Sequence, residues 1–393
     1  MVHLLLVIIY ITFISLGLPD SLLGAAWPSM YSGLHIPISY AGIISMIIAG
    51  GTIISSLISA RLVRKMGTGW ITTISVGMTA TALFGFSISQ SFVLLCLWAI
   101  PYGLGAGSVD AVLNNFVVLH YKAKHMSWLH CFWGIGATLG PCIMGISLTG
   151  NLGWHYGYRL ISLIQIALTG ILLFSLPMWK SNQDQMEDKS NSALPLTFIQ
   201  LMGFPGARQT LIAFFCYCSL EQVTGLWGSS YMVLEKGITK EAAASFISLF
   251  YLGITAGRFF SGLLTLKLNT KNIIRVGQGL IIVGIALIFL SITRTALLTG
   301  LILTGLGCAP IYPGLLYQTP ERFGKNASQS MMGLQMACAY LGSTFSPPLI
   351  GLLTEKISIT IYPVFQLVFT GVMILLVEYC NRGSHLRRRT VNE

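Results

Sequence analysis

The sequence contains few charged residues, and this scarcity excludes most classes of soluble protein. Asp, Glu, Lys and Arg together make up 9% of the 393 residues, whereas 54% are hydrophobic. Soluble domains carry about 25% charged residues, so the composition predicts an integral membrane protein. The net charge of +11 does not indicate nucleic-acid binding, because the basic residues are spread along the chain and do not cluster on one face.

Motifs for metal binding, nucleotide binding and nucleophilic catalysis are also lacking. The eight cysteines fall in apolar segments without the spacing of metal ligands or of a disulfide framework, so we interpret them as small packing residues. Because no nucleotide-binding loop is present, we expect energy to come from an ion gradient and not from ATP. We expect no enzymatic activity and no cofactor. The first apolar run contains Asp20 and has no preceding Lys or Arg, which argues against a cleaved signal peptide.

Long apolar runs are abundant. A membrane-spanning helix needs about 20 apolar residues, and twelve segments qualify: 4–31, 40–60, 69–88, 92–118, 127–149, 158–178, 209–233, 242–265, 273–291, 295–317, 328–351 and 359–379. We expect an all-α membrane protein of twelve transmembrane helices in two pseudo-symmetric six-helix bundles, residues 1–178 and 208–380. Residues 179–207 are predicted to be a cytoplasmic linker, and residues 381–393 a basic cytoplasmic tail.

The distribution of basic residues predicts the orientation. If both termini are cytoplasmic, 18 of the 23 Lys and Arg residues, Arg258 among them, fall in cytoplasmic loops and tails, as the positive-inside rule requires. The five exceptions are Arg159, Lys236, Lys240, Arg294 and Lys356. We therefore expect a multi-pass protein of the plasma (inner) membrane, surrounded by the lipid bilayer, monomeric and without a nucleic-acid partner.

A carboxylate lies inside the first apolar run. At membrane depth an ionised side chain such as Asp20 costs roughly 2.5–3.5 kcal/mol on insertion scales. Gly24, Trp27 and Tyr31 follow it at i+4, i+7 and i+11, which is one face of a helix. We interpret this stripe as the wall of a polar cavity. The alternative is a buried acid that forms a hydrogen bond with a neighbouring helix for structure alone.

The two halves carry similar residues at an offset of about 200 positions. The first matching pair is Asp20-x3-Gly24-x2-Trp27-x3-Tyr31 and Glu221-x3-Gly225-x-Trp227-x3-Tyr231. The other pairs are Gly103-Leu-Gly105 with Gly305-Leu-Gly307, and Pro141-x3-Gly145 with Pro347-x3-Gly351. A twofold repeat of six spans is typical of transporters whose binding site lies between parallel halves.

Two basic segments carry a resemblance to a known family. The turn Ser59-Ala-Arg61-Leu-Val-Arg64-Lys65-Met-Gly67 resembles the signature loop Gly-x-x-x-Asp-Arg-x-Gly-Arg-Arg of the major facilitator superfamily, with Ala60 in place of Asp. The segment Gly257-Arg258-x3-Gly262 keeps the glycines and an arginine of the second copy. The resemblance extends over the whole chain. It implies transport by alternating access of two six-helix bundles.

Motifs in the fourth and fifth predicted spans indicate a more specific family within the superfamily. Their motifs are Gly103-Leu-Gly105-Ala-Gly107-Ser-Val-Asp110-Ala-Val-Leu-Asn114-Asn115 and Leu129-His130-Cys-Phe-Trp133-Gly134-Ile-Gly136. Within the superfamily the chain is most similar to the fucose/glucose–proton symporter family. In that family the acids of spans 1 and 4 couple proton movement to transport, and the resemblance places this role on Asp20 and Asp110.

The candidate site residues follow from these patterns. The predicted proton-coupling residues are Asp110, Asp20 and His130, with helix capping as the alternative for His130. The predicted solute-binding residues are Asn114, Glu221, Gln222, Trp27, Trp227, Tyr231, Asn115, Gln335 and Tyr312. Carboxylates and amides suit sugar hydroxyls, and aromatic rings offer faces for pyranose C–H groups. The alternative for the aromatic residues is packing within the core.

We expect a secondary active transporter that takes up a sugar or a similar small polar solute together with protons, or with sodium. One alternative is a proton-coupled exporter of amphipathic compounds, because Gly136-x3-Gly140-Pro141-x3-Gly145 resembles the span 5 antiporter motif of that group. A second alternative is a membrane sensor or scaffold, which the short tail after Arg382 disfavours.

Overall fold

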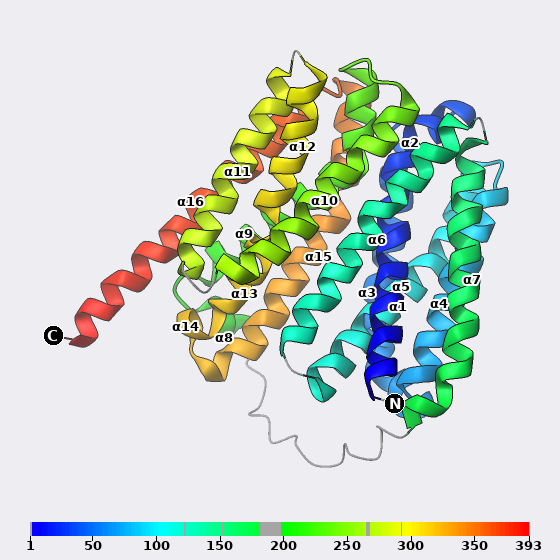
Figure 1. Ribbon diagram of the computed structural model, residues 1–393. Helices are drawn as coiled ribbons and strands as arrows, with labels where there is room; N and C mark the ends of the chain where they lie inside the picture. Colours follow the sequence, from blue (N-terminus) through cyan, green and yellow to red (C-terminus); the bar gives the residue numbers. More distant parts are fainter. Residues whose placement is uncertain are drawn as a thin grey trace. The chain divides into compact units, whose positions relative to one another are not determined.

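The computed structural model describes residues 2–121, 123–150, 152–180, 198–264, 268–291 and 293–392. Within these residues the regular secondary structure is entirely α-helical, in helices α1 to α16 (Figure 1). The expected all-α membrane fold is therefore confirmed. Most of the predicted linker, residues 181–197, lies outside the described residues.

The helices reproduce the predicted spans, with two of the spans divided. The helices of the first part of the chain are α1 (Val2–Asp20), α2 (Leu22–Gly33), α3 (Tyr40–Met66), α4 (Thr68–Ile88), α5 (Phe92–His120), α6 (Ala123–Thr149) and α7 (Gly153–Lys180). Those that follow are α8 (Phe198–Met202), α9 (Ala207–Leu234), α10 (Lys240–Leu264), α11 (Thr270–Leu290), α12 (Arg294–Cys308), α13 (Ile311–Tyr317), α14 (Thr319–Phe323), α15 (Lys325–Lys356) and α16 (Ile361–Asn392). The predicted tail continues α16 as one helix (Figure 1).

Eleven helical stretches among the described residues are long and apolar enough to cross a membrane. Helix α9 has 28 residues, which also suffices in length. Its sequence is more polar, with Glu221 and Gln222 near the middle of the helix. Arg258 was expected in a cytoplasmic turn, but it lies inside α10 and within the candidate span Lys240–Ser261.

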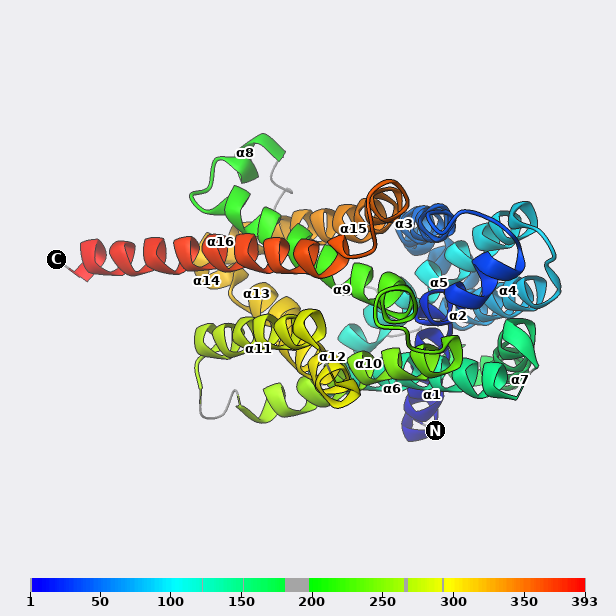
Figure 2. The same ribbon diagram turned by 90° about the horizontal axis from the view of Figure 1, so that it is seen from above.

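The chain folds into two compact units. Unit 1 comprises Met1–Lys189, Gly225–Leu252 and Pro347–Ile359, and unit 2 comprises Ser190–Thr224, Gly253–Ser346 and Thr360–Glu393. Unit 1 thus combines α1 to α7 with parts of α9, α10 and α15. Within unit 1, helices α4, α5 and α7 lie side by side (Figure 2).

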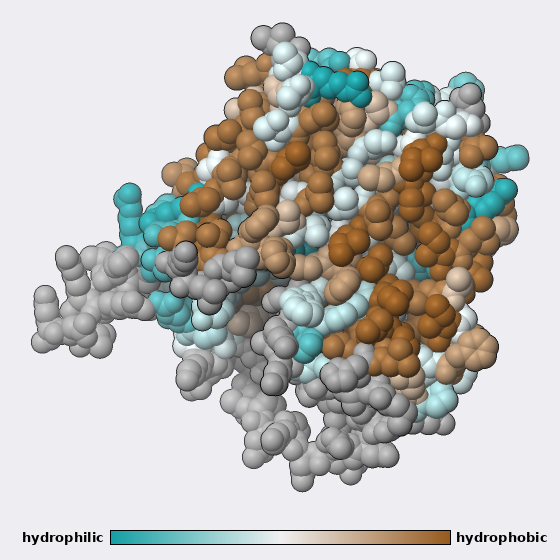
Figure 3. Space-filling model, in the orientation of Figure 1, coloured by the Kyte–Doolittle hydropathy of each residue, from teal (hydrophilic) through white to brown (hydrophobic). Residues whose placement is uncertain are grey.

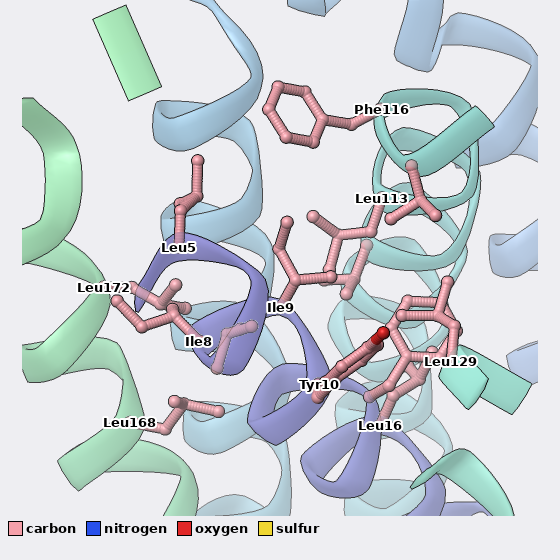
Figure 4. Packing of buried hydrophobic residues seen from close by; sticks show 14 of the residues in the cluster. Leu5, Ile8, Ile9, Tyr10, Leu16, Leu113, Phe116, Leu129, Leu168 and Leu172 are labelled. Carbon is pink, nitrogen blue, oxygen red and sulfur yellow. The ribbon is translucent and has the colours of Figure 1, made fainter. Parts of the chain in front are cut away.

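The core of unit 1 is built around α1. Leu5, Ile8 and Ile9 of α1 lie beside side chains from α5 and α7, among them Leu113 and Leu172 (Figure 4). All five are buried. Because lipid is as apolar as leucine, the packing of these side chains, more than their removal from water, holds the helices together.

Unit 2 relies on close backbone contacts between α11 and α12. A Cβ atom added at Gly277 would lie 2.6 Å from the carbonyl oxygen of Gly307, and one at Gly300 would lie 2.7 Å from that of Gly284. Such pairs of small residues let membrane helices approach closely. Exposed apolar residues such as Phe174 and Leu375 suit a lipid-facing surface, and Figure 3 shows large apolar patches among the described residues of one face.

Candidate functional site

The first span is interrupted beside its acid. Pro19 has no N–H to donate to the carbonyl of Ser15, and α1 ends at Asp20, with Ser21 outside any helix. The carbonyl oxygen of Ser15 instead accepts a 2.6 Å hydrogen bond from Nε2 of Gln165, on α7. A partner side chain therefore satisfies the carbonyl that the proline leaves free, as membrane depth requires.

A second proline, in α6, leaves free a carbonyl group that interacts with the break between α1 and α2. Pro141 cannot donate to the carbonyl of Ala137, and this oxygen accepts a 2.8 Å hydrogen bond from Oγ of Ser21. The helices come close at glycines: a Cβ atom at Gly136 would lie 2.0 Å from the carbonyl oxygen of Ile14. This crossing of α1 and α6 brings the end of α1 next to side chains of α6.

Asp20 is held by donors from two other helices. Its Oδ2 accepts a 2.8 Å hydrogen bond from the indole Nε1 of Trp133, on α6. Its Oδ1 accepts a 3.0 Å hydrogen bond from the hydroxyl of Tyr102, on α5. Tyr102 is buried, whereas Asp20 keeps exposed surface. A carboxylate near the middle of a candidate span is thus positioned by two donors of the protein and keeps accessible surface.

Asp110 and Asn114 form the second polar pair of unit 1. They lie one turn apart on α5, and Nδ2 of Asn114 donates a 2.8 Å hydrogen bond to Oδ1 of Asp110. The amide oxygen of Asn114 is buried and accepts no hydrogen bond from the described residues. Asp110 lies within electrostatic range of Asp20, and Asn115 is exposed. The structure therefore brings both predicted acids into one polar region of unit 1.

The histidines of α6 lie beside aromatic residues of α1. His130 contacts the ring of Phe13 edge-on, with ring centroids 6.1 Å apart. His125 was absent from the predicted residues, yet its Nδ1 lies 2.7 Å from the hydroxyl of Tyr10. The role of His130 in proton transfer stays a prediction.

The aromatic residues predicted to stack on a solute are packing residues in unit 1. The indole nitrogens of Trp27 and Trp227 donate to the backbone carbonyls of Ile38 and Pro347, at 2.8 and 2.9 Å. Neither ring has exposed surface, and Tyr231 is 1% exposed. In this structure these rings offer no face to a solute.

The repeated glycines of the two halves contact each other. A Cβ atom at Gly24 of α2 would lie 2.0 Å from the carbonyl oxygen of Gly225 of α9. Two polar contacts also join distant segments of unit 1. Nζ of Lys240 donates to Oγ of Ser32 at 2.6 Å, and Oγ of Ser39 donates to Oε2 of Glu355.

Unit 2 holds the remaining predicted residues. Glu221 is half-buried and Gln222 is exposed. Tyr217 and Cys308 each interact electrostatically with both Glu221 and Arg258. Arg258 is a charged residue inside a membrane helix, and it is absent from the predicted site residues. The signal was available, because an arginine within an apolar helix indicates a functional position.

The other two predicted residues of unit 2 lie among packed side chains. The ring of Tyr312 contacts those of Phe214 and Tyr217 at centroid distances of 5.4 and 6.1 Å. Gln335 is fully buried and its Oε1 accepts a 3.0 Å hydrogen bond from Thr319. A contact between Gln335 and a solute would require this packing to change.

An ion pair joins two helices of unit 2. Arg275 of α11 donates to both carboxylate oxygens of Glu378 of α16, each at 2.7 Å. The two side chains are 51% and 28% exposed, so the pair joins α11 and α16 at the surface of unit 2. Among the described residues no group of three or more His, Cys, Asp or Glu side chains could hold a metal ion.

Comparisons with known proteins agree with this architecture. The family model for the Major Facilitator Superfamily matches residues 9–294 and 210–388. "Bypass of stop codon protein 6" of Saccharomyces cerevisiae is 22% identical over 95% of this chain and 82% of its own length. The glucose/mannose transporter GlcP of Bacillus subtilis is 22% identical over 77% of each chain.

A solved structure has the same fold. The nucleoside transporter NupG, in a mutant form, superimposes with a TM-score of 0.77 over 95% of this chain and 98% of its own, at 14% sequence identity. The family-model match spans both halves of the sequence and nearly all the predicted helices. The chain belongs to the Major Facilitator Superfamily.

Proposed function

We propose that this transporter takes up a sugar or a similar small polar solute together with protons, by alternating access. The observation that carries the proposal is the Asp20 carboxylate, which lies at a helix break near the middle of a candidate span. Tyr102 and Trp133 donate to it, yet it remains exposed. Ionisable groups at this depth are costly and mark ion or substrate pathways.

The two acids of unit 1, Asp110 and Asp20, have different roles in this proposal. Asp110 is the proton-coupling acid, because its hydrogen bond with Asn114 ties its protonation state to an amide that can also contact a solute. Asp20 is proposed to take up and release a proton as well, and it interacts electrostatically with Asp110. His130, on α6, is proposed to relay protons.

Polar groups in each unit suit a hydroxylated solute. In unit 1, the amide of Asn114 has a buried oxygen that accepts no hydrogen bond from the described residues, and Asn115 is exposed. In unit 2, Gln222 is exposed and Glu221 half-buried. Carboxylate and amide groups can pair with adjacent sugar hydroxyls. The glucose/mannose transporter among the relatives also supports a sugar.

We further propose a plasma (inner) membrane location with both termini in the cytoplasm. The support is that 17 of the 23 basic residues are expected on that side, which are the 18 predicted from the sequence without Arg258, since Arg258 lies inside α10. The test is a tag added after Glu393 and exposed to a reagent that cannot cross the membrane. We expect the reagent to label the tag only in broken cells. Labelling in intact cells would contradict the proposed orientation.

The test is uptake of labelled hexoses into proteoliposomes with an imposed pH gradient. We expect the parent protein to accumulate a hexose when the outside is acidic, and Asp110→Asn to lose accumulation while keeping downhill exchange. Accumulation by Asp110→Asn equal to that of the parent would refute the coupling assignment. Export of amphipathic compounds, without movement of any hexose, would replace the proposal with the exporter alternative.

A further inference from the structure

The two hydrogen bonds to Asp20 come from chemically different donors. The indole N–H of Trp133 can only donate, whereas the hydroxyl of Tyr102 can donate and accept. Each binds a different oxygen of the carboxylate, Oδ2 and Oδ1 respectively. The ionised carboxylate satisfies both donors at once.

This difference favours one oxygen for the proton of neutral Asp20. A proton on the lone pair of Oδ2 that accepts from Trp133 would face an N–H with no lone pair, and a proton on the other lone pair of Oδ2 would need a different acceptor. A proton on Oδ1 would face Tyr102, whose hydroxyl can turn and accept the new O–H. One O–H bond forms at Oδ1, Tyr102 changes from donor to acceptor, and Trp133 continues to donate to Oδ2.

We propose that Tyr102 and Trp133 are positioning residues for Asp20, which direct its proton to Oδ1 and set the pH at which this carboxyl group takes up and releases that proton. The inference rests on the proposed function, in which Asp20 takes up and releases a proton. Neither residue was identified from the sequence as a partner of Asp20.

Three other titratable residues interact with Asp20 or with its partner Tyr102. Asp110, on α5, acts on Asp20 electrostatically. Tyr158 of α7 and Tyr251 of α10 lie within electrostatic range of Tyr102. Tyr158 provides a matched control, because its hydroxyl is buried and has no hydrogen-bond partner among the described residues. Tyr158→Phe removes a hydroxyl from the same region without removing a hydrogen bond.

The first experiment measures the pH profile of hexose uptake by proteoliposomes. Both Tyr102→Phe and Trp133→Phe remove a donor that stabilises the ionised carboxylate more than the neutral acid. We expect each to move the midpoint of the profile upward by about one pH unit, and Tyr158→Phe to leave it unchanged. In an Asp20→Asn background the first two substitutions should cause no shift.

The second experiment needs no solute. Tryptophan emission of the purified protein is followed against pH, and we expect one titrating component that disappears in both Trp133→Phe and Asp20→Asn. This component tests the inference even if no hexose is transported, which would refute the proposed function alone. If one variant fails to fold, the other still provides the test.

The inference fails if Tyr102→Phe and Trp133→Phe give the same pH profile as Tyr158→Phe. It also fails if their shifts persist in the Asp20→Asn background, or if the titrating emission persists in Asp20→Asn. Normal coupling through Asp110 combined with any of these results would leave the proposed function intact.

Discussion

Gly24→Ala tests one of the close helix contacts of unit 1. The added methyl group would lie 2.0 Å from the carbonyl oxygen of Gly225 and 2.8 Å from Cα of Leu226. Ordinary contact begins at 3.4 Å. Both neighbours are backbone atoms, so no side-chain rotation relieves the overlap, and α2 and α9 must separate by roughly 1.4 Å at this point.

The energetic cost follows from this overlap. Overpacking by a methyl group in a well-packed core costs about 1–3 kcal/mol. A free-energy change of this size alters an equilibrium about 5- to 150-fold. We therefore expect Gly24→Ala to favour conformations in which α2 and α9 are apart by at least about fivefold.

Hydrogen–deuterium exchange with mass spectrometry measures this change without any solute. Local opening raises the exchange rate of backbone amides, so peptides from residues 22–33 and 225–234 should exchange at least about fivefold faster in Gly24→Ala. Peptides from α11 and α12 should be unaffected. The matched control is Gly50→Ala in α3, where an added Cβ meets nothing within 4 Å.

The control should be neutral or slightly stabilising, because alanine is favoured over glycine within helices by roughly 0.5–1 kcal/mol. Equal exchange in Gly24→Ala and Gly50→Ala would refute the packing argument. Faster exchange throughout the protein would also contradict it, since that result indicates global destabilisation.

Three further predictions concern single hydrogen bonds and ion pairs. Gln165→Leu should lower the free energy of unfolding by about 1–3 kcal/mol, because the carbonyl of Ser15 loses its donor. Thermal unfolding in detergent measures the change in stability. Unchanged stability of Gln165→Leu would contradict the prediction. Ser21→Ala should cost a similar amount at the α6 carbonyl that it caps, and should make the α1–α2 break exchange faster in the same deuterium experiment. Arg275→Gln should cost less than about 1 kcal/mol, because its pair with Glu378 is largely exposed; the effect should shrink in high salt, and a large salt-independent loss would be inconsistent with a surface pair.

The helices could be predicted from the sequence because long apolar runs have few alternatives in a membrane. The run 92–118, for example, became α5 over Phe92–His120. The interruption of the first span was not predicted, although Pro19 was visible beside the acid. Proline and aspartate together did not reveal whether the helix bends or stops, since that depends on Gln165 and Ser21, which satisfy carbonyl groups far away in sequence.

The site was only partly accessible to sequence reasoning. Asp110 and Asn114 pair as their spacing of four residues predicts. The partners of Asp20 could not be found by spacing, since Tyr102 and Trp133 lie 82 and 113 positions away. The repeat identified Gly24 and Gly225 as equivalent positions but gave no indication that they touch, because contact depends on how the helices cross.

Measuring proton entry together with hexose entry tests most directly the central claim, that transport is coupled to protons. Proteoliposomes loaded with a pH-sensitive dye receive hexose from outside without any imposed gradient. We predict that the lumen acidifies as the hexose enters, and that Asp110→Asn abolishes the acidification while hexose still equilibrates. Entry of hexose into parent proteoliposomes with no change in luminal pH would contradict proton coupling by the carboxylates of unit 1.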